Sequence, residues 1–196
     1  MKGTAVITGA SSGIGAIYAQ RLAERAYDLV LIARRADQLA LVAERIRSKT
    51  GRKVEVFPAD LTDELDVARV ETLLKSDPSI TLLVNNAGLG AAGTLLQSDV
   101  DKMSSMISLN VTSLMRLTYA IVPSFVARRQ GTIINIGSVV ALTPETLNGV
   151  YGGTKAFVLA LSQNLRKELG GHWRPSASRP ARSNSHGLLG NLRKAG

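Results

Sequence analysis

The stretch Thr4-Ala5-Val6-Ile7-Thr8-Gly9-Ala10-Ser11-Ser12-Gly13-Ile14-Gly15 passes from a short apolar run into a glycine-rich loop, and an amphipathic segment follows it. Glycines let the backbone turn tightly and approach a pyrophosphate closely, while a helix N-terminus offers free N–H groups and partial positive charge. Three glycines alone are often only a turn, but between a strand and a helix they favour a dinucleotide-binding loop. The residues expected to contact the cofactor from this loop are Gly9, Ser11, Ser12, Gly13, Ile14 and Gly15.

Short apolar runs and longer amphipathic segments alternate after this loop. The apolar runs are continuous, as is typical of parallel strands covered on both faces, and strand–helix–strand repetition requires crossover connections. The predicted strands span residues 4–8, 29–33, 54–57, 80–84 and 132–136. The predicted helices span residues 13–26, 36–50, 63–75, 99–129 and 151–169, and Pro123 is expected to kink or break the fourth helix. The sequence therefore predicts an α/β, Rossmann-like fold: a doubly wound parallel sheet in a single domain.

Two arginines follow the second predicted strand, in Ala33-Arg34-Arg35. An NAD site tends to keep an acid at this place for the ribose hydroxyl, whereas a guanidinium group matches a 2′-phosphate. The two arginines could also be ordinary solvent-exposed side chains that bind no ligand. Both cations lie near the start of a predicted helix, however, where the helix dipole disfavours positive charge and a bound anion would relieve it. We therefore predict NADP (NADPH) as the cofactor, with Arg34 and Arg35 among the residues that bind it.

Tyr151 and Lys155 are four residues apart in the last predicted helix, so their side chains lie on one face. A phenol is a poor base at neutral pH, because its pKa lies near ~10, but a nearby ammonium group stabilises the phenolate. Ser138 follows the fifth predicted strand and could hydrogen-bond a substrate oxygen. Such a pair occurs by chance in many helices, and a serine after a strand is usually a cap. The position of the Tyr151 and Lys155 pair after a fifth predicted parallel strand nevertheless favours a site for hydride transfer between a nicotinamide and a carbonyl or alcohol.

With these motifs in this order, residues 1 to about 170 resemble the short-chain dehydrogenase/reductase family, in its NADP-preferring type. The loop Thr8–Gly15 resembles the family's TGxxxGxG motif, Asn85-Asn86-Ala87-Gly88 its NNAG motif, and Ser138, Tyr151 and Lys155 its catalytic triad. Asp60-Leu61 resembles the acid, after the third strand, that contacts the adenine ring in relatives. Asn110, in Ser108-Leu109-Asn110-Val111, matches a helix asparagine of the family.

This resemblance implies roles for individual residues. Asn110 would kink its helix and hold a water that relays protons to Lys155, and Lys155 would also bind the nicotinamide ribose. Asn85 is interpreted as structural and Asn86 as facing the cofactor. The resemblance therefore adds these residues to the predicted cofactor site: Asp60, Leu61, Asn86, Ala87, Gly88, Tyr151 and Lys155. Apolar candidates for the substrate pocket suggest a lipophilic or aliphatic carbonyl substrate, and they are Leu89, Val139, Val140, Leu142 and Leu147.

The pattern of the family ends after the last predicted helix. Residues 171–196 contain no Val, Ile, Asp or Glu and are rich in Arg, Ser and Pro, so we expect a basic, disordered tail there rather than a sixth strand and a substrate lid. A frameshifted or prematurely ended reading frame would explain this change. Strand 132–136 would then be an exposed apolar edge, and turnover would be weak or absent.

Composition narrows the remaining classes of function. The net charge is +9, of which residues 171–196 carry +5, so the excess is largely a property of the tail and does not indicate nucleic-acid binding. The chain has no cysteine and no apolar stretch long enough for a bilayer, so we expect a cytoplasmic protein. The resemblance to the family implies a homodimer or homotetramer that pairs through helices near 99–129 and 151–169. No metal site is predicted. Two alternatives stay open: a non-catalytic NADP-binding remnant, and an interaction protein that holds anionic partners through its basic tail.

Overall fold

The chain forms strands and helices in strict alternation through its first half. The computed structural model describes residues 2–91, 93–143, 149–170 and 179–180 of the 196. The first half contains β1 (Thr4–Thr8), α1 (Gly13–Ala23), β2 (Asp28–Ala33), α2 (Ala36–Thr50), β3 (Val54–Pro58), α3 (Glu64–Ser76) and β4 (Ile80–Asn85). The second half contains η1 (Leu95–Gln97), α4 (Val100–Ile107), η2 (Ser108–Ser113), α5 (Leu114–Arg128), β5 (Thr132–Gly137), η3 (Val139–Ala141), α6 (Gly149–Leu169) and β6 (Arg179–Pro180).

The strands form one parallel sheet in the order β3-β2-β1-β4-β5-β6. From β1 the chain adds strands on one side as far as β3, then returns and adds β4 and β5 on the other side. The strand order therefore reverses between β1 and β4, and ligands of open α/β sheets bind at the carboxyl ends of the strands at such a point. The predicted doubly wound parallel sheet is confirmed.

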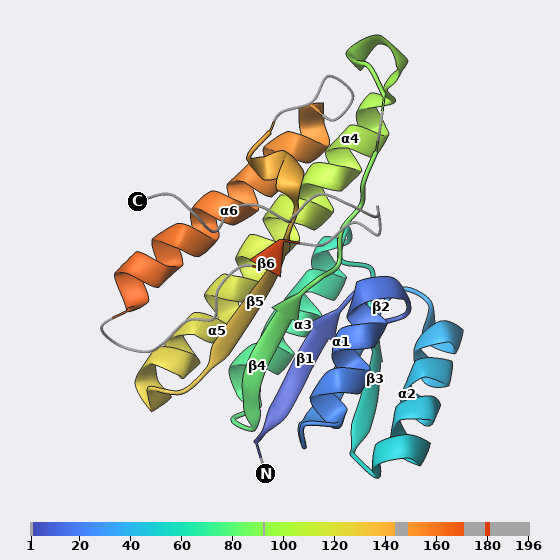
Figure 1. Ribbon diagram of the computed structural model, residues 1–196, viewed down its shortest axis with the longest axis vertical. Helices are drawn as coiled ribbons and strands as arrows, with labels where there is room; N and C mark the ends of the chain where they lie inside the picture. Colours follow the sequence, from blue (N-terminus) through green and yellow to red (C-terminus); the bar gives the residue numbers. More distant parts are fainter. Residues whose placement is uncertain (1, 92, 144–148, 171–178, 181–196) are drawn as a thin grey trace, which may run out of the picture.

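Helices cover both faces of the sheet (Figure 1). Val6 of β1 packs with residues of α3 and α5, while Ala5 and Ile7 pack with residues of α1 and α2. Successive strand residues thus supply two separate cores, because side chains alternate between the faces of a strand. Both faces are buried, which is why these strands are continuous apolar runs in the sequence.

A π-helical segment, not Pro123, interrupts the long helix between β4 and β5. The segment η2 carries Asn110 at its third position and separates α4 from α5, while α5 runs through Pro123 without a break. Pro123 therefore does not break this helix, and the alternative expectation of a kink there stays a prediction. The face of α5 around it, with Leu117, Ile121 and Phe125, is buried in the core and keeps the helix continuous despite the lost hydrogen bond.

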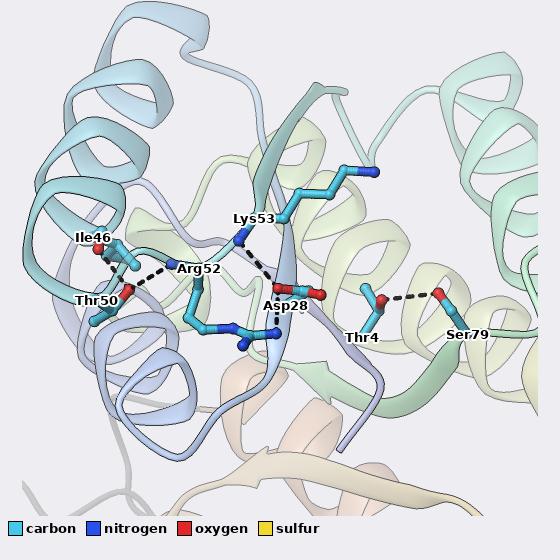
Figure 2. Close-up of polar contacts among 7 residues, drawn as sticks. All are labelled: Thr4, Asp28, Ile46, Thr50, Arg52, Lys53 and Ser79. Carbon is cyan, nitrogen blue, oxygen red and sulfur yellow. Dashed lines mark hydrogen bonds and ion pairs between the residues drawn. The ribbon is translucent and has the colours of Figure 1, made fainter. Parts of the chain in front are cut away.

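Polar contacts secure the amino edge of the sheet, on the side away from the switch point. Asp28 accepts hydrogen bonds from Arg52 Nη2 at 2.7 Å and from the Lys53 N–H at 3.0 Å (Figure 2). The Thr50 hydroxyl donates to Ile46 O at 2.7 Å and accepts from the Arg52 N–H at 3.3 Å. These bonds fix the connection from α2 to β3 against the start of β2. They also give hydrogen-bond partners to the N–H groups of Arg52 and Lys53, which follow α2.

The described end of the chain adds one short strand to the sheet. A two-residue strand, β6, pairs in parallel with Ile136 and Gly137 of β5, where no sixth strand was expected. Pairing through main-chain atoms needs no apolar pattern, so the composition of this segment could not reveal it. The side chains of β5 are buried or half-buried. Among the described residues, β6 pairs with only Ile136 and Gly137, so the expected exposed sheet edge along residues 132–135 stays a prediction. Residues 171–178 and 181–196, which include most of the predicted tail, lie outside the described residues.

The last helix is less deeply buried than its sequence pattern suggests. Phe157, Leu161, Leu165 and Leu169 repeat every four residues, yet all four are only half-buried, whereas Thr154, Lys155 and Val158 are the buried residues of α6.

In the part of the chain that the structure describes, no helix combines the length and the apolar character needed to cross a membrane.

Leu74 and Leu65 lie on the same helix, α3, but Leu74 is fully buried and Leu65 is 77% exposed. We expect Leu74→Ala to lower the free energy of unfolding by about 2–5 kcal/mol, because it removes buried methyl groups and leaves a cavity. The matched change Leu65→Ala should alter it by no more than about 0.5 kcal/mol. Urea denaturation of both variants measures the difference, and equal losses would contradict the assignment of the core.

Candidate cofactor and catalytic site

The Thr8 hydroxyl joins the carboxyl ends of β1 and β4. It accepts hydrogen bonds from the N–H groups of Asn86 and Ala87, both at 3.0 Å, and donates to Val84 O at 3.3 Å. In return, Asn86 Nδ2 donates to Thr8 O at 2.9 Å and to Gly9 O at 3.1 Å. The turn after β4 therefore holds the beginning of the glycine-rich loop by several hydrogen bonds at once.

Two glycines of the loop are required by close packing. Gly9 has φ +64°, and a Cβ atom built on it would lie 2.8 Å from Asn86 Nδ2. A Cβ atom on Gly15 would collide with Gly9 O and with Asn86 Nδ2. Gly13 is different: a Cβ atom there would meet open space, but its φ of +54° is a conformation that other residues rarely adopt. The loop thus leaves its outer surface open above the first turn of α1.

A cleft of about 470 Å³ opens at this edge of the sheet and contains most of the predicted cofactor site. The predicted residues that line it are Gly9, Ser11, Ser12, Ile14, Arg34, Arg35, Asp60, Leu61, Asn86, Ala87 and Gly88. Gly13, Gly15, Tyr151 and Lys155, which were also predicted to bind the cofactor, do not line it. The sequence interpretation gave no cofactor role to four further lining residues, Ala33, Ala59, Leu89 and Leu109.

Arg34, Arg35 and Asp60 lie at the end of the cleft formed by β2 and β3. Arg34 Nη1 is 3.8 Å from Asp60 Oδ2, and the Arg34 side chain is 64% exposed. The second Asp60 oxygen accepts from the Thr62 N–H at 2.9 Å and from the Thr62 hydroxyl at 2.7 Å. Arg35 is the N-cap residue of α2, and its side chain makes no capping hydrogen bond. An anion at this end of the cleft would meet two guanidinium groups next to a helix N-terminus.

These features fit a dinucleotide phosphate. No acidic residue occupies the first turn of α1, and the first N–H groups of a helix have no partner within it. Gly13 adds no side chain on the open side of this turn, while Gly9 and Gly15 let the loop pack directly against Asn86. The donors needed for a pyrophosphate are therefore on one side of the cleft, and Arg34 and Arg35 can receive a further phosphate at the other end.

Tyr151 and Lys155 lie beside the segment that follows Asn86. Lys155 is only 7% exposed; its Nζ donates to Ile136 O at 2.8 Å and lies 5.8 Å from the centre of the Tyr151 ring. A Cβ atom on Gly88 would lie 3.7 Å from Lys155 Nζ, and one on Gly90 would lie 3.9 Å from Tyr151 Cε2. Burial lowers the pKa of Lys155 below its ordinary value. The phenol and the amine thus lie next to one wall of the cleft.

Asn110 is buried between that wall and α6. Its Oδ1 accepts from the Leu89 N–H at 2.8 Å, and its Nδ2 donates to Leu89 O at 2.8 Å and to Thr154 Oγ1 at 3.1 Å. Asn85 has a different environment, because its Nδ2 donates to Thr118 Oγ1 and Asn135 Oδ1 inside the sheet and α5. The interpretation of Asn85 as structural agrees with these contacts. Asn86 lines the cleft and also holds the glycine-rich loop.

Ser138 lies directly after β5 and begins η3, against which the start of α6 packs. It is half-buried, at the same edge of the sheet as the glycine-rich loop. Of the predicted substrate-pocket residues, Leu142 and Val139 are 72% and 56% exposed and Leu89 and Val140 are half-buried. Leu147 lies outside the described residues.

The sequence interpretation missed the roles of two threonine hydroxyls. Thr8 was given only as part of the glycine-rich loop, and Thr154, which lies between Tyr151 and Lys155, was given no role. Both are buried and bridge separate chain segments. Hydroxyl groups near a predicted site are a signal for such bridges, but only the fold shows which partners they meet.

Comparison with known proteins agrees with this geometry. The family model for short chain dehydrogenase matches residues 3–173. The human 17-beta-hydroxysteroid dehydrogenase type 3 is 38% identical over 168 residues, which cover 84% of this chain and 53% of that protein. The chain thus spans about half the length of this relative.

Two solved structures are similar in fold and sequence. A short-chain dehydrogenase from Sphingobium yanoikuyae, in complex with NADPH, has a TM-score of 0.85 and 48% identity, covering 87% of this chain and 67% of that one. The bulky-bulky ketone specific alcohol dehydrogenase from Comamonas testosteroni also has a TM-score of 0.85, with 46% identity, covering 88% of this chain and 69% of that one. Taken with the doubly wound sheet and the site at its switch point, these matches establish that the chain belongs to the short-chain dehydrogenase family.

Proposed function

We propose that this chain binds NADP(H) in the cleft and transfers a hydride between it and a secondary alcohol or ketone through Ser138, Tyr151 and Lys155. The observation that carries the proposal is the meeting of three elements at one edge of the sheet. These are the first turn of α1, the wall formed by Asn86–Leu89, and the side chains of Tyr151 and Lys155. The family is defined by redox chemistry, and one similar structure contains NADPH.

Each residue of the proposed site would have a distinct role in the reaction. Bound NADPH supplies the hydride in the direction of reduction. Tyr151 would give its phenolic proton to the carbonyl oxygen, which becomes the hydroxyl of the alcohol, while the Ser138 hydroxyl holds that oxygen in place. Lys155 would stabilise the resulting phenolate and use its remaining N–H donors on the ribose. Asn110 would keep the wall at Leu89 in register with α6.

The proposed substrate is a lipophilic ketone with a bulky group on each side. Val139 and Leu142, at the edge of the site, expose large apolar side chains, and so do Leu95 and Leu96 in the segment that follows the cleft wall. Such surfaces bind apolar groups rather than charged ones. The names of the two relatives, one a hydroxysteroid dehydrogenase and one specific for bulky-bulky ketones, support the same class.

We also propose that copies of the chain associate in the cytoplasm. On α5, Tyr119 is 68% and Met115 is 36% exposed, beside a hollow of about 310 Å³ that Glu71 and Arg116 also line. A chain without cysteine suits a reducing compartment. Light scattering of the protein recovered from the cytosolic fraction of its own cells tests both points. The expected mass is at least that of a dimer; a monomer, or recovery with membranes, would contradict the respective proposal.

Arg34→Ala should weaken NADPH binding about tenfold, because it removes a charge-assisted hydrogen bond to the 2′-phosphate, and should leave NADH binding unchanged. Calorimetric titration of both nucleotides measures the two affinities. The matched control is Arg45→Ala, which removes an exposed arginine from α2 away from the cleft. An equal loss of affinity for both nucleotides would contradict the role given to Arg34.

Tyr151→Phe should reduce the turnover of a bulky ketone at least about 100-fold, because it removes the proton donor, while the affinity for NADPH stays within a few-fold. Tyr27→Phe is the control, since Tyr27 precedes β2 at the opposite edge of the sheet, and it should retain activity. Steady-state kinetics and NADPH titration on the same preparations separate chemistry from binding. NADPH binding by the unaltered chain without turnover on a broad carbonyl panel would contradict the proposed reaction.

A further inference from the structure

The carboxamide of Asn110 has no freedom to rotate without losing contacts. Asn110 is 1% exposed, and Leu89 presents both an N–H donor and a carbonyl acceptor to it at 2.8 Å. The amide can satisfy both only with its oxygen towards the Leu89 N–H. The second N–H of Nδ2 then points to Thr154 Oγ1, at 3.1 Å. Buried polar groups that lose a partner are costly, so the three bonds hold the group as a set.

Thr154 is the acceptor that completes this set. It is 3% exposed and lies in the helical turn that carries both Tyr151 and Lys155. Its hydroxyl donates to Tyr151 O at 2.8 Å. Since a hydroxyl has one hydrogen, this donation leaves the oxygen lone pairs to receive the Asn110 N–H. The Thr154 hydroxyl therefore connects the main chain of the Tyr151 turn to the amide that holds Leu89.

The hydrogen bonds that join Thr154 to Asn110 and Asn110 to Leu89 cross a tightly packed part of the site. A Cβ atom on Gly88 would lie 3.2 Å from Asn110 Oδ1 and 3.7 Å from Lys155 Nζ. The cleft wall, the amide and the amine are thus packed against one another without an intervening side chain. A small rotation of the α6 turn relative to the wall changes the position of Tyr151 and Lys155 with respect to the cleft.

We propose that Thr154 is a positioning residue, whose hydroxyl ties the Asn110 carboxamide, and through it the cleft wall at Leu89, to the turn of α6 that carries Tyr151 and Lys155. This inference rests on the proposed function for its catalytic consequence. The tether itself is a property of the chain alone. It makes no contact with substrate or cofactor, and it acts by fixing the distance between two walls of the site.

Thr118 offers a matched control within the same fold. It is also a fully buried helix threonine, its hydroxyl also donates to a carbonyl of its own helix, Leu114 O at 2.8 Å, and it also accepts from an asparagine Nδ2, that of Asn85 at 3.1 Å. Thr118 does not line the cleft. Loss of its hydroxyl should destabilise the fold to a similar extent without changing the geometry of the site.

The direct test is the exchange rate of the Leu89 amide, measured by NMR relative to the Leu31 amide in the buried strand β2. Thr154→Val keeps the shape of the side chain but loses the hydroxyl. The relative exchange of Leu89 should rise about tenfold, because the amide that accepts its N–H loses one of three bonds. Thr154→Ser should restore the original ratio, and Thr118→Val should leave it unchanged. If Thr154→Val does not fold, Thr154→Ala serves the same purpose.

An unchanged ratio of the Leu89 to the Leu31 exchange rate in Thr154→Val, or an equal rise of this ratio in Thr118→Val, would contradict the proposed role of Thr154. This holds whether or not the chain is an active enzyme. In an active preparation, Thr154→Val should lower kcat for a ketone about tenfold with little change in KM, and Thr154→Ser should recover it. A fall in kcat of the same size in Thr118→Val would also count against positioning by Thr154. Failure of the unaltered chain to reduce any ketone would contradict only the proposed function. The proposed connection through Thr154 would still be tested by the exchange ratio.

Discussion

The hydrogen bonds between the end of β1 and the turn after β4 are the constraint on which the site depends. Thr8 and Asn86 bind each other's segments through side-chain and main-chain atoms, at the place where the strand order reverses. Because this join is short, the following loop must contain glycines where it contacts Asn86. The first turn of α1 is then aimed at the cleft. The phosphate-binding end of the site is therefore a consequence of how the two halves of the sheet meet.

Buried amide groups extend this order from the sheet to the catalytic helix. Asn85 ties β4 to β5 and α5, whereas Asn110 ties the wall after β4 to α6. The π-helical segment brings Asn110 into this position within an otherwise regular helix. Lys155 is buried beside it, which lowers its pKa. A polar layer thus crosses the apolar interior, and its amide N–H groups have specific hydrogen-bond partners, whereas the buried Asn85 Oδ1 has none among the described residues.

Local sequence patterns predicted the strands and helices whose conformation depends mainly on residues close together in the chain. Strand β1 was predicted to the residue, and so was α2, because buried parallel strands are continuous apolar runs and Gly51, in a left-handed conformation, ends α2. Pro123 does not break α5, because core packing of the helix outweighs the local preference of proline. The bridges made by Thr8 and Thr154, and the pairing of β6, could not be predicted, since each joins segments far apart in the chain. The roles of Ser138, Tyr151 and Lys155 were inferred from their chemistry and spacing and from the resemblance, and they stay proposals.

The central claim is that one cleft presents a dinucleotide to the phenol and the amine of α6. A crystal structure of the chain with NADPH tests this most directly. We expect the pyrophosphate at the first turn of α1, the 2′-phosphate at Arg34, and the nicotinamide between Gly88 and the side chains of Tyr151 and Lys155. Nucleotide bound elsewhere, or with its nicotinamide turned away from α6, would contradict the account.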